Sequence, residues 1–388
     1  MRIVDTHLHL VYLDKFTYPW LGGAPAINRQ WDASAYFAEA EGLGIETALH
    51  MEVDVAEREM EDESRFVLDH LHPRIGGAIA AARPEHVDFP AHLERLAQLK
   101  GVKGIRRILH TQPDELSQGE LFAANLRRLP PLGLTFDLCV LARQLPIGRQ
   151  LAAKCPDVQF VLDHCGVPDI AGGGYDAWAE GISRIAELPN VAAKISGITA
   201  YAKPDWSLDD IRPYVEHVID RFGWDRVVWG SDHPVVTLNA DLTRWVAATK
   251  AVVSGASETE QAKLFHRNAE RLYRLQPRAA KRYGSILGLK PEAIAEYKRV
   301  HAAVWPKVLE QIKASHISNY SIYLREPENL LFAYFEYSGS DYTADMAAMA
   351  ADPNTQEWWK LCMPMQAPLA SKTEAEWWAG MEEVFHLD

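Results

Sequence analysis

Two histidines stand near the start of the chain, in the segment VDTHLHL at residues 4–10. Side chains two residues apart point the same way along a β-strand, so Asp5, His7 and His9 are predicted to share one face of a buried strand. Buried imidazoles need polar partners. On these residues alone three interpretations stay open: the histidines bind a metal, they polarise a substrate as neutral rings, or they have no chemical role.

Polar side chains also end the later apolar runs of the first 232 residues. They are Arg106, Arg107 and His110 in the fourth run, Asp137 in the fifth, Asp163 and His164 in the sixth, Lys194 in the seventh, and Asp232 and His233 in the eighth. Barrel enzymes place their chemistry at the C-terminal ends of parallel strands, so this repeated placement predicts one shared site. Lys194 is interpreted as structural. For Arg106, an ion pair with a neighbouring acid stays open beside substrate binding.

The elements that must position these residues are eight short apolar runs, separated by stretches with helical spacing. The runs are 3–7, 46–53, 75–81, 102–109, 134–140, 158–164, 191–197 and 227–232. Strands that alternate with helices indicate a parallel sheet, and eight such units in roughly 250 residues fit an α/β protein with a (β/α)8 TIM barrel. An open doubly wound sheet is the alternative, but no glycine-rich phosphate loop follows a run. A helix over 264–275 is expected to close the barrel.

The sequence changes character in the Pro/Ala/Lys/Arg-rich stretch at 276–282, which is typical of a linker. We expect a barrel domain at 1–276, a linker at 277–280 and a second domain at 281–388. The order of elements predicted for the second domain is that of an α+β ferredoxin-like fold. Its predicted strands are 282–289, 319–326, 329–338 and 382–388, and its predicted helices are 291–315 and 343–363.

The composition narrows the range of partners. The 388 residues carry a formal net charge of −13, which argues against nucleic acid or an anionic membrane surface as a partner. No apolar run is long enough to span a bilayer, and the pattern of a signal peptide is missing at the N-terminus. The cysteines are scattered without a CxxC pair, as expected in a reducing cytosol. The sequence therefore predicts a cytoplasmic protein that acts on small molecules.

The segments DTHLH, LDHCG, WGSDHP and NAERLYRL resemble the amidohydrolase superfamily, and within it the branch of sugar-lactone and aryl-lactone hydrolases. The resemblance implies roles for four positions, as metal ligands or, in metal-free lactonases, as substrate-binding groups and general base: His7, His9, His164 and Asp232. The fifth strand, LTFDLCV, lacks the histidine of metal-dependent members, and the fourth has arginines where the binuclear type has a lysine. We therefore expect no required cofactor, with a divalent metal such as zinc on these four residues as the alternative.

Hydrolysis of a lactone needs a base that deprotonates water and groups that stabilise the oxyanion. Asp232 is expected to be the base, because a carboxylate with an ordinary pKa of about 3.9 is ionised at neutral pH. The groups expected to bind the substrate and polarise its carbonyl are His7, His9, His164 and Arg106.

The second region resembles the L-rhamnose mutarotase family in the segments EYKRVHAAVWP, NYSIYL, NLLFAYFE, WWK and VFHL. The resemblance implies that His301 is the catalytic acid or base, and that the sugar is bound by Tyr297, Tyr320, Trp358 and Trp359. Residues four apart on a helix share one face, which brings Tyr297 and His301 together, and histidine titrates near neutral pH. A dimer interface is the alternative for the tryptophan pair, and Trp305 is expected in the core.

Together these features predict a bifunctional enzyme of deoxy-sugar catabolism. The barrel would hydrolyse L-fucono- or L-rhamnono-lactone, and the C-terminal domain would interconvert the anomers of the 6-deoxy-L-hexose and form a homodimer. The alternative is a metal-dependent decarboxylase, or another amidohydrolase, with a non-catalytic dimerising C-terminal module.

Overall fold

The computed structural model describes residues 1–388 except residues 71, 276–279, 340–341, 375 and 388. The chain divides into two compact units, Met1–Gln276 and Pro277–Asp388. The linker predicted at 277–280 lies, apart from Ala280, outside the described residues. No helix among the described residues is long and apolar enough to cross a membrane.

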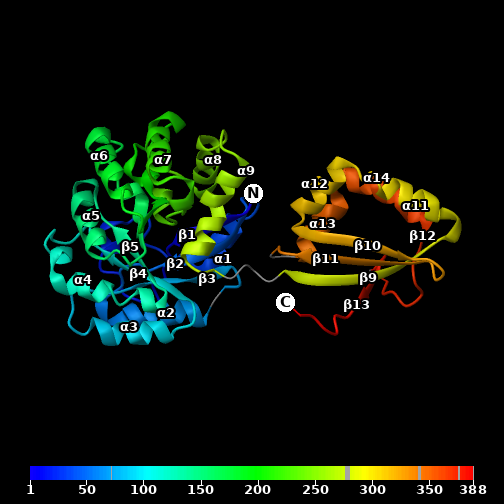
Figure 1. Ribbon diagram of the computed structural model, residues 1–388, viewed down its shortest axis with the longest axis horizontal. Coiled ribbons are helices and arrows are strands. Elements are labelled where there is room, and N and C mark those ends of the chain that lie inside the picture. The colour runs from blue at the N-terminus through cyan, green and yellow to red at the C-terminus, as the bar shows by residue number, and fades with distance from the viewer. Residues whose placement is uncertain (71, 276–279, 340–341, 375, 388) are drawn as a thin grey trace. The chain divides into compact units, whose positions relative to one another are not determined.

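The first unit is built around eight parallel strands that follow one another in chain order (Figure 1). They are β1 (Ile3–Leu8), β2 (Ile45–Met51), β3 (Ile75–Ala81), β4 (Val102–Ile108), β5 (Thr135–Cys139), β6 (Phe160–Leu162), β7 (Val191–Ile195) and β8 (Val227–Trp229). Leu8 forms a parallel bridge to His233, just beyond β8, so the last strand returns to the first. The predicted TIM barrel is confirmed.

Helices form a ring outside these strands. They are α1 (Ala33–Glu39), α2 (Met60–Asp69), α3 (Phe89–Gln98), α4 (Glu120–Leu126), α5 (Leu145–Lys154), α6 (Tyr175–Ala186), α7 (Leu208–Phe222) and α8 (Leu242–Val252). The helix predicted at 264–275 is interrupted: α9 (Glu258–Ala262) leads through a π-helical turn at Lys263–Arg267 into α10 (Asn268–Leu272). Apolar residues from 269–275 pack against an apolar cluster inside the barrel, which includes Val4, Ile79 and Val228. One end of the barrel is therefore filled by apolar side chains.

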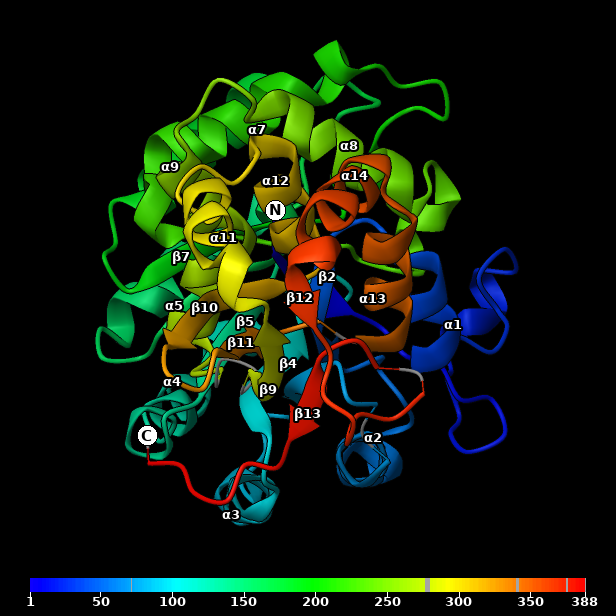
Figure 2. The same cartoon turned by 90° about the vertical axis from the view of Figure 1, so that its right-hand side faces the viewer.

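The second unit is a mostly antiparallel sheet in the order β10-β11-β9-β12, with β13 also paired to β9. Its strands are β9 (Lys281–Leu289), β10 (Ile317–Arg325), β11 (Leu330–Tyr337), β12 (Gln366–Ala367) and β13 (Ala379–Met381). Its helices, which cover one face of the sheet, are α11 (Ile294–His301), α12 (Pro306–Ala314), α13 (Tyr342–Ala351) and α14 (Pro353–Cys362) (Figure 2). This agrees with the predicted ferredoxin-like fold.

Three expected elements of the second unit differ in detail. The helix predicted at 291–315 is two helices, because Pro306 starts α12 and the residue before it, Trp305, is extended. The helix predicted at 343–363 is likewise divided at Asp352, whose side chain accepts a hydrogen bond from the Thr355 N–H and caps α14. The strand predicted at 382–388 is wrong, since residues 382–387 form no strand and the last strand is β13.

Candidate active site

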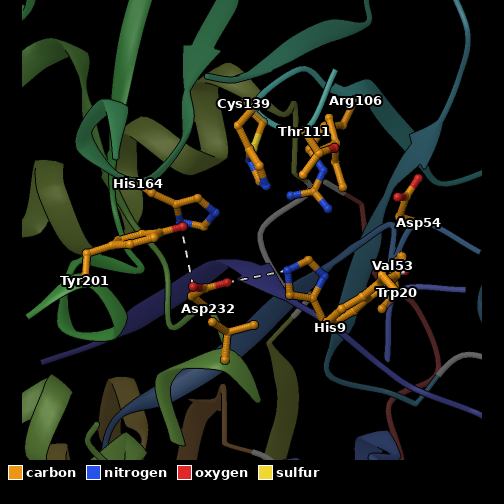
Figure 3. A pocket seen from close by; sticks show the side chains of 13 residues that line it. His9, Trp20, Val53, Asp54, Arg106, Thr111, Cys139, His164, Tyr201 and Asp232 are labelled. Atoms are coloured by element: carbon orange, nitrogen blue, oxygen red, sulfur yellow. Dashed lines mark hydrogen bonds and ion pairs between the residues drawn. The ribbon is translucent and has the colours of Figure 1, made fainter. Parts of the chain in front are cut away.

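Residues at the C-terminal ends of the barrel strands surround a pocket of about 220 Å³. Its walls come from β4 and β5 themselves and from the loops that follow β1, β2, β4, β6, β7 and β8, as Figure 3 shows for the labelled side chains. The lining residues are His9, Trp20, Val53, Asp54, Arg106, Ile108, His110, Thr111, Cys139, His164, Tyr201, Asp232 and Val235. The predicted strand-end residues His9, Arg106, His164 and Asp232 thus meet in one place.

The backbone of β1 has an irregular register that redirects His7. The strand register shifts between Asp5 and Leu8. Asp5 turns toward the helix ring, where it accepts a hydrogen bond from the Tyr36 hydroxyl, while His7 points into the barrel toward Lys194. The prediction that Asp5 and His7 share a face is therefore wrong. Asp5 instead accepts hydrogen bonds from the backbone N–H groups of His7 (2.9 Å) and Ser231 (2.8 Å). These bonds connect the irregular stretch of β1 to the end of β8.

Asp232 is a buried carboxylate that faces three imidazoles. Its Oδ1 lies 3.4 Å from His9 Nε2, and its Oδ2 lies 3.9 Å from His164 Nδ1 (Figure 3). The same Oδ1 lies 3.7 Å from His7 Nε2. Burial raises the pKa of Asp232 to about 6, although His164 and Arg106 oppose this shift. The carboxylate remains mostly ionised at neutral pH and is more basic than an exposed one.

His9 is held as a neutral ring with a defined tautomer. Its Nδ1 lies 3.0 Å from the carbonyl oxygen of Met51 and 3.1 Å from that of Glu52, so Nδ1 carries the proton. Burial and the charge of Arg106 lower the pKa of His9 to about 3. The unprotonated Nε2 therefore faces Asp232.

His164 follows β6 on a left-handed stretch of backbone. Its φ is 52°, and Asp232 also has a positive φ, of 58°. Such conformations cost non-glycine residues about 1–3 kcal/mol each and gather at functional sites. The His164 Nδ1 lies 3.0 Å from the Ser196 hydroxyl. Beside it, Gly197 (φ 67°) leaves no room for a Cβ, which would collide with His164 Nδ1 and lie 2.9 Å from Asp232 Oδ2.

A buried layer of charges supports His7 below the pocket. Lys194 Nζ lies 2.6 Å from Asp137 Oδ1 and 3.1 Å from Asp163 Oδ1, and it donates to the Thr6 carbonyl at 3.1 Å. Burial alone would lower the pKa of Lys194, but the two carboxylates more than offset it and keep the ammonium charged. His7 lies 3.3 Å from this ammonium and 3.4 Å from Asp163. This placement supports the interpretation of Lys194 as structural.

Arg106 makes an ion pair with a neighbouring acid, which is one of the two interpretations that the sequence left open. Its Nε donates to Glu52 Oε1 at 2.5 Å and its Nη2 donates to the Glu52 carbonyl at 2.7 Å, while its Nη1 lies 3.3 Å from His7 Nε2. The guanidinium also lines the pocket. Glu52 was missed by the sequence reasoning. An acid in the apolar stretch HMEV was the available signal, because a buried carboxylate needs a charged partner.

Other pocket residues come from irregular loops and carried no signal in the sequence. Trp20 lies between β1 and α1 and donates its indole N–H to the Val53 carbonyl at 2.7 Å. Tyr201 follows β7, and burial and the nearby Asp232 raise the pKa of its hydroxyl. Figure 3 shows the Tyr201 ring on the same side of the pocket as His164.

The donor set fits a divalent cation. His7, His9 and Asp232 each offer one nitrogen or oxygen atom, and these three atoms lie within 4.8 Å of one another; the same holds for His7, Asp163 and His164. His9 Nε2 and Asp232 Oδ1 are two acceptors that face each other, and neutral imidazoles with a carboxylate are ligands that zinc accepts. Arg106 competes for the lone pair of His7 Nε2.

In the second unit two of the residues predicted to bind the sugar, Tyr297 and Trp358, contact His301. The His301 ring stacks on Tyr297 with centroids 4.0 Å apart, and its Nδ1 lies 2.9 Å from the Tyr297 carbonyl. Trp358 meets the His301 ring edge-on at 5.3 Å. Burial chiefly, and the neighbouring Tyr320 to a lesser degree, raise the pKa of Tyr297, which places Tyr320 close to this cluster.

The tryptophans of the second unit differ from the prediction in where they lie. Trp358 is buried against His301, whereas Trp359 is half-buried against the core, since consecutive helical residues point in different directions. Trp305 was expected in the core but is 39% exposed, and its ring contacts that of Trp358 at 5.3 Å. The extended backbone before Pro306 turns Trp305 out of the helical register.

Comparisons with known proteins assign each unit to a protein family. The sequence profile of the amidohydrolase family matches residues 4–275, and that of the L-rhamnose mutarotase family matches residues 282–387. An L-fucono-1,5-lactonase of Burkholderia ambifaria is 30% identical over 222 residues, which are 55% of this chain and 77% of that protein. An L-rhamnose mutarotase of Oceanobacillus iheyensis is 31% identical over 108 residues, which are 28% of this chain and 99% of that protein.

A solved structure supports the barrel fold. The crystal structure of an amidohydrolase from Burkholderia multivorans with bound zinc is 23% identical, with a TM-score of 0.65, and covers 71% of this chain and 100% of that one. The chain therefore belongs to the amidohydrolase family over its barrel and to the L-rhamnose mutarotase family over its second unit, and it is a hydrolase that carries a mutarotase domain.

Proposed function

We propose that the barrel hydrolyses the lactone of a 6-deoxy-L-hexonic acid, L-fucono- or L-rhamnono-lactone, and that the second unit interconverts the anomers of the corresponding sugar. The names of the lactonase and mutarotase relatives support this pairing. The observation that carries the barrel activity is the buried Asp232 carboxylate beside His9 and His164 in a pocket of monosaccharide scale.

In the proposed reaction Asp232 takes a proton from water, and the water oxygen bonds to the lactone carbonyl carbon. The carbonyl π electrons move to oxygen, where N–H groups of Arg106 and His164 stabilise the oxyanion. Collapse of this intermediate breaks the bond to the ring oxygen, which takes the proton that Asp232 received. His9 presents an unprotonated Nε2, so we assign it to orienting the water rather than to stabilising the oxyanion.

The charges of the pocket favour a neutral lactone. Arg106 is the single Lys or Arg among the pocket-lining residues, all of which are described, and Glu52 already pairs with it at 2.5 Å. A substrate carboxylate would therefore meet no unpaired cation. The same observation weighs against the alternative of a decarboxylase, because its substrate carries a carboxylate.

His7, His9 and Asp232 would hold a divalent ion, which would supply Lewis-acid polarisation of the carbonyl or of the attacking water. We propose that hydrolysis does not require it. The test is activity after chelation and dialysis, with metal content measured on the same sample. Loss of activity that returns with zinc would overturn this part of the proposal.

For the second unit we propose that His301 moves the protons of ring opening. Its Nδ1 is bonded to the Tyr297 carbonyl, which leaves Nε2 to take the proton of the anomeric hydroxyl and to return a proton to the ring oxygen. Tyr297 and Tyr320 would bind hydroxyls, and Trp358, with Trp359 at the margin, would pack against the pyranose.

We further propose that the second unit forms a homodimer. Tyr323 on β10 and Phe385 near the C-terminus are large apolar side chains with 64% and 80% exposure, and burying them against a second copy would remove apolar area from water. Light scattering of the full chain should give about twice the mass of 43.6 kDa. A monomer at micromolar concentration would overturn the dimer.

The central experiment is a panel of five- and six-membered sugar lactones assayed by acid release. It is run beside saturation-transfer NMR of anomeric exchange on L-fucose and L-rhamnose. We expect one 6-deoxy lactone to be opened fastest and the matching sugar to exchange faster with the protein present. If no lactone of the panel is opened, the barrel assignment fails, whatever the NMR shows.

A further inference from the structure

The pocket wall across from Asp232 carries a histidine–cysteine pair that has no role in the proposed reaction. His110 follows β4 and Cys139 ends β5, and His110 Nδ1 lies 3.0 Å from Cys139 Sγ. Both residues line the pocket. Because the eight strands follow in order around the barrel, β4 and β5 lie opposite β8 and β1, which lead to Asp232 and His9.

We infer from the contact with the Cys139 thiol which nitrogen of His110 carries the proton. Burial raises the pKa of the Cys139 thiol, so the thiol stays protonated and needs an acceptor, and His110 Nδ1 is in position to be that acceptor. Burial also lowers the pKa of His110, so its ring is neutral. A neutral imidazole that accepts at Nδ1 donates at Nε2. In the described part of the chain no hydrogen-bond partner is found for this Nε2, which leaves a donor for a ligand.

The position of the lactone carbonyl determines what this donor meets. The carbonyl carbon must lie near Asp232 to be attacked, so the hydroxyl-bearing carbons of the ring extend across the pocket toward His110. We propose that His110 determines specificity for hydroxylated lactones by donating its Nε2–H to a ring hydroxyl away from the carbonyl. Cys139 is the positioning residue that holds the imidazole in this tautomer. This inference rests on the lactonase activity proposed above.

A site that bonds a hydroxyl discriminates against an analogue that lacks it, because its own buried donor is then left unpaired. The test compares L-fucono- and L-rhamnono-lactone with δ-valerolactone, which keeps the ring and the carbonyl but has no hydroxyl. We expect His110→Ala to lower kcat/KM for the sugar lactone about tenfold and to leave the value for δ-valerolactone essentially unchanged. His110→Gln, which keeps a donor, should recover part of the loss.

Equal losses on both lactones in His110→Ala would show a merely structural role and overturn the proposal. If wild-type protein does not turn over δ-valerolactone, its inhibition constant against the sugar lactone replaces kcat/KM in the comparison. If wild-type protein opens none of the lactones, the proposed lactonase function has failed. That outcome is distinguishable from a failure of the His110 proposal, which is judged only by whether His110→Ala loses activity on one lactone or on both.

A second measurement tests the role of Cys139 without activity. Long-range ¹H–¹⁵N spectra of the full chain, labelled at histidine, report the tautomer of His110. We expect an unprotonated Nδ1 in wild type and in Cys139→Ser, which keeps a donor, and a shift toward the other tautomer in Cys139→Ala. A protonated Nδ1 in the wild type would overturn the positioning role directly.

Discussion

In the barrel, Arg106, Asp163 and Lys194 are ionised groups that lie almost wholly out of contact with solvent, whereas His301 in the second unit is flanked by the rings of Tyr297 and Trp358. The backbone differs in the same sense. His164 and Asp232 hold left-handed conformations, while His301 ends an ordinary α-helix. One chain thus contains a site built from fixed charges and a site built from aromatic rings around one imidazole.

The difference fits the charge that each of the two proposed reactions would develop. Attack on a lactone creates an oxyanion, and fixed dipoles and charges in a buried site stabilise it without reorganising. Opening a hemiacetal removes one proton from the sugar and adds another. The sugar ring therefore needs a group that carries protons and an apolar surface to pack against, more than it needs fixed charges. The left-handed residues His164 and Asp232 and the buried ionised groups belong to the barrel site, whereas the catalytic histidine proposed for the second unit has ordinary helical backbone.

The largest effect is expected from removing the base of the barrel. Asp232→Asn keeps the shape but cannot accept the proton, and lactone hydrolysis should fall about 10²–10⁴-fold. Anomeric exchange by the same preparation should be unchanged, which controls for folding. Hydrolysis at the wild-type rate would show that Asp232 is not the base.

Removing the His301 imidazole of the second unit should slow anomeric exchange and leave lactone hydrolysis unchanged, the reverse of the effect of Asp232→Asn. We expect His301→Ala to slow anomeric exchange about 10²-fold, as measured by saturation-transfer NMR, with hydrolysis by the barrel intact. Tyr297→Phe is the variant matched to His301→Ala, because it keeps the ring that stacks on His301 and the backbone carbonyl that bonds His301 Nδ1. If exchange persists in His301→Ala, the second unit is a binding or dimerising module.

The close packing beside His164 gives a smaller but still large effect. Gly197→Ala places a methyl group against His164 and Asp232 at a positive φ, and we expect kcat/KM for the lactone to fall about tenfold or more, given a strain of about 1–2 kcal/mol. Gly255→Ala is the control, since nothing lies within 4 Å of the added methyl there. Equal activity in the two variants would contradict the described geometry.

Hydrolysis by the barrel should depend on pH through the carboxylate of Asp232. The pKa of Asp232 is raised to about 6, and the base acts in its ionised form, so hydrolysis should fall about tenfold for each unit of pH below 6. Burial lowers the pKa of His301 below its ordinary value of 6.5, so this ring stays neutral to lower pH. Rate profiles from pH 4.5 to 8 should show hydrolysis declining below about pH 6, and hydrolysis that stays constant down to pH 4.5 would contradict the assignment of Asp232 as the base.

The smallest effect should come from separating the units. Limited proteolysis is expected to cut within residues 276–282 and to release two folded fragments, near the ends of the two compact units. A mixture of the fragments should show both activities at the level of the intact chain. A single resistant core without a cut there would argue against independent domains.

Much of the barrel site was predictable because strand periodicity and strand ends are local signals. The runs before Arg106, His164 and Asp232 are apolar and strand-length, and parallel strands bring their ends together. Glu52 was missed because it lies inside an apolar run, where the strand pattern leads one to expect apolar side chains. Trp20, Tyr201 and Gly197 lie in irregular loops without a repeating pattern, and the outward turn of Asp5 depends on a register shift that strict alternation cannot express.

The hydrogen bond from the Ser231 N–H to Asp5 has a consequence for the order in which the chain acquires its site. It joins residues 226 positions apart in the sequence, and the backbone of Asp232 is held by the His7 carbonyl at 2.8 Å. During synthesis, the carboxylate that His7 and His9 face, that of Asp232, is therefore added only with the end of the eighth strand. Contacts of such high sequence separation slow folding, so the barrel should gain activity late, after most of its helices have formed.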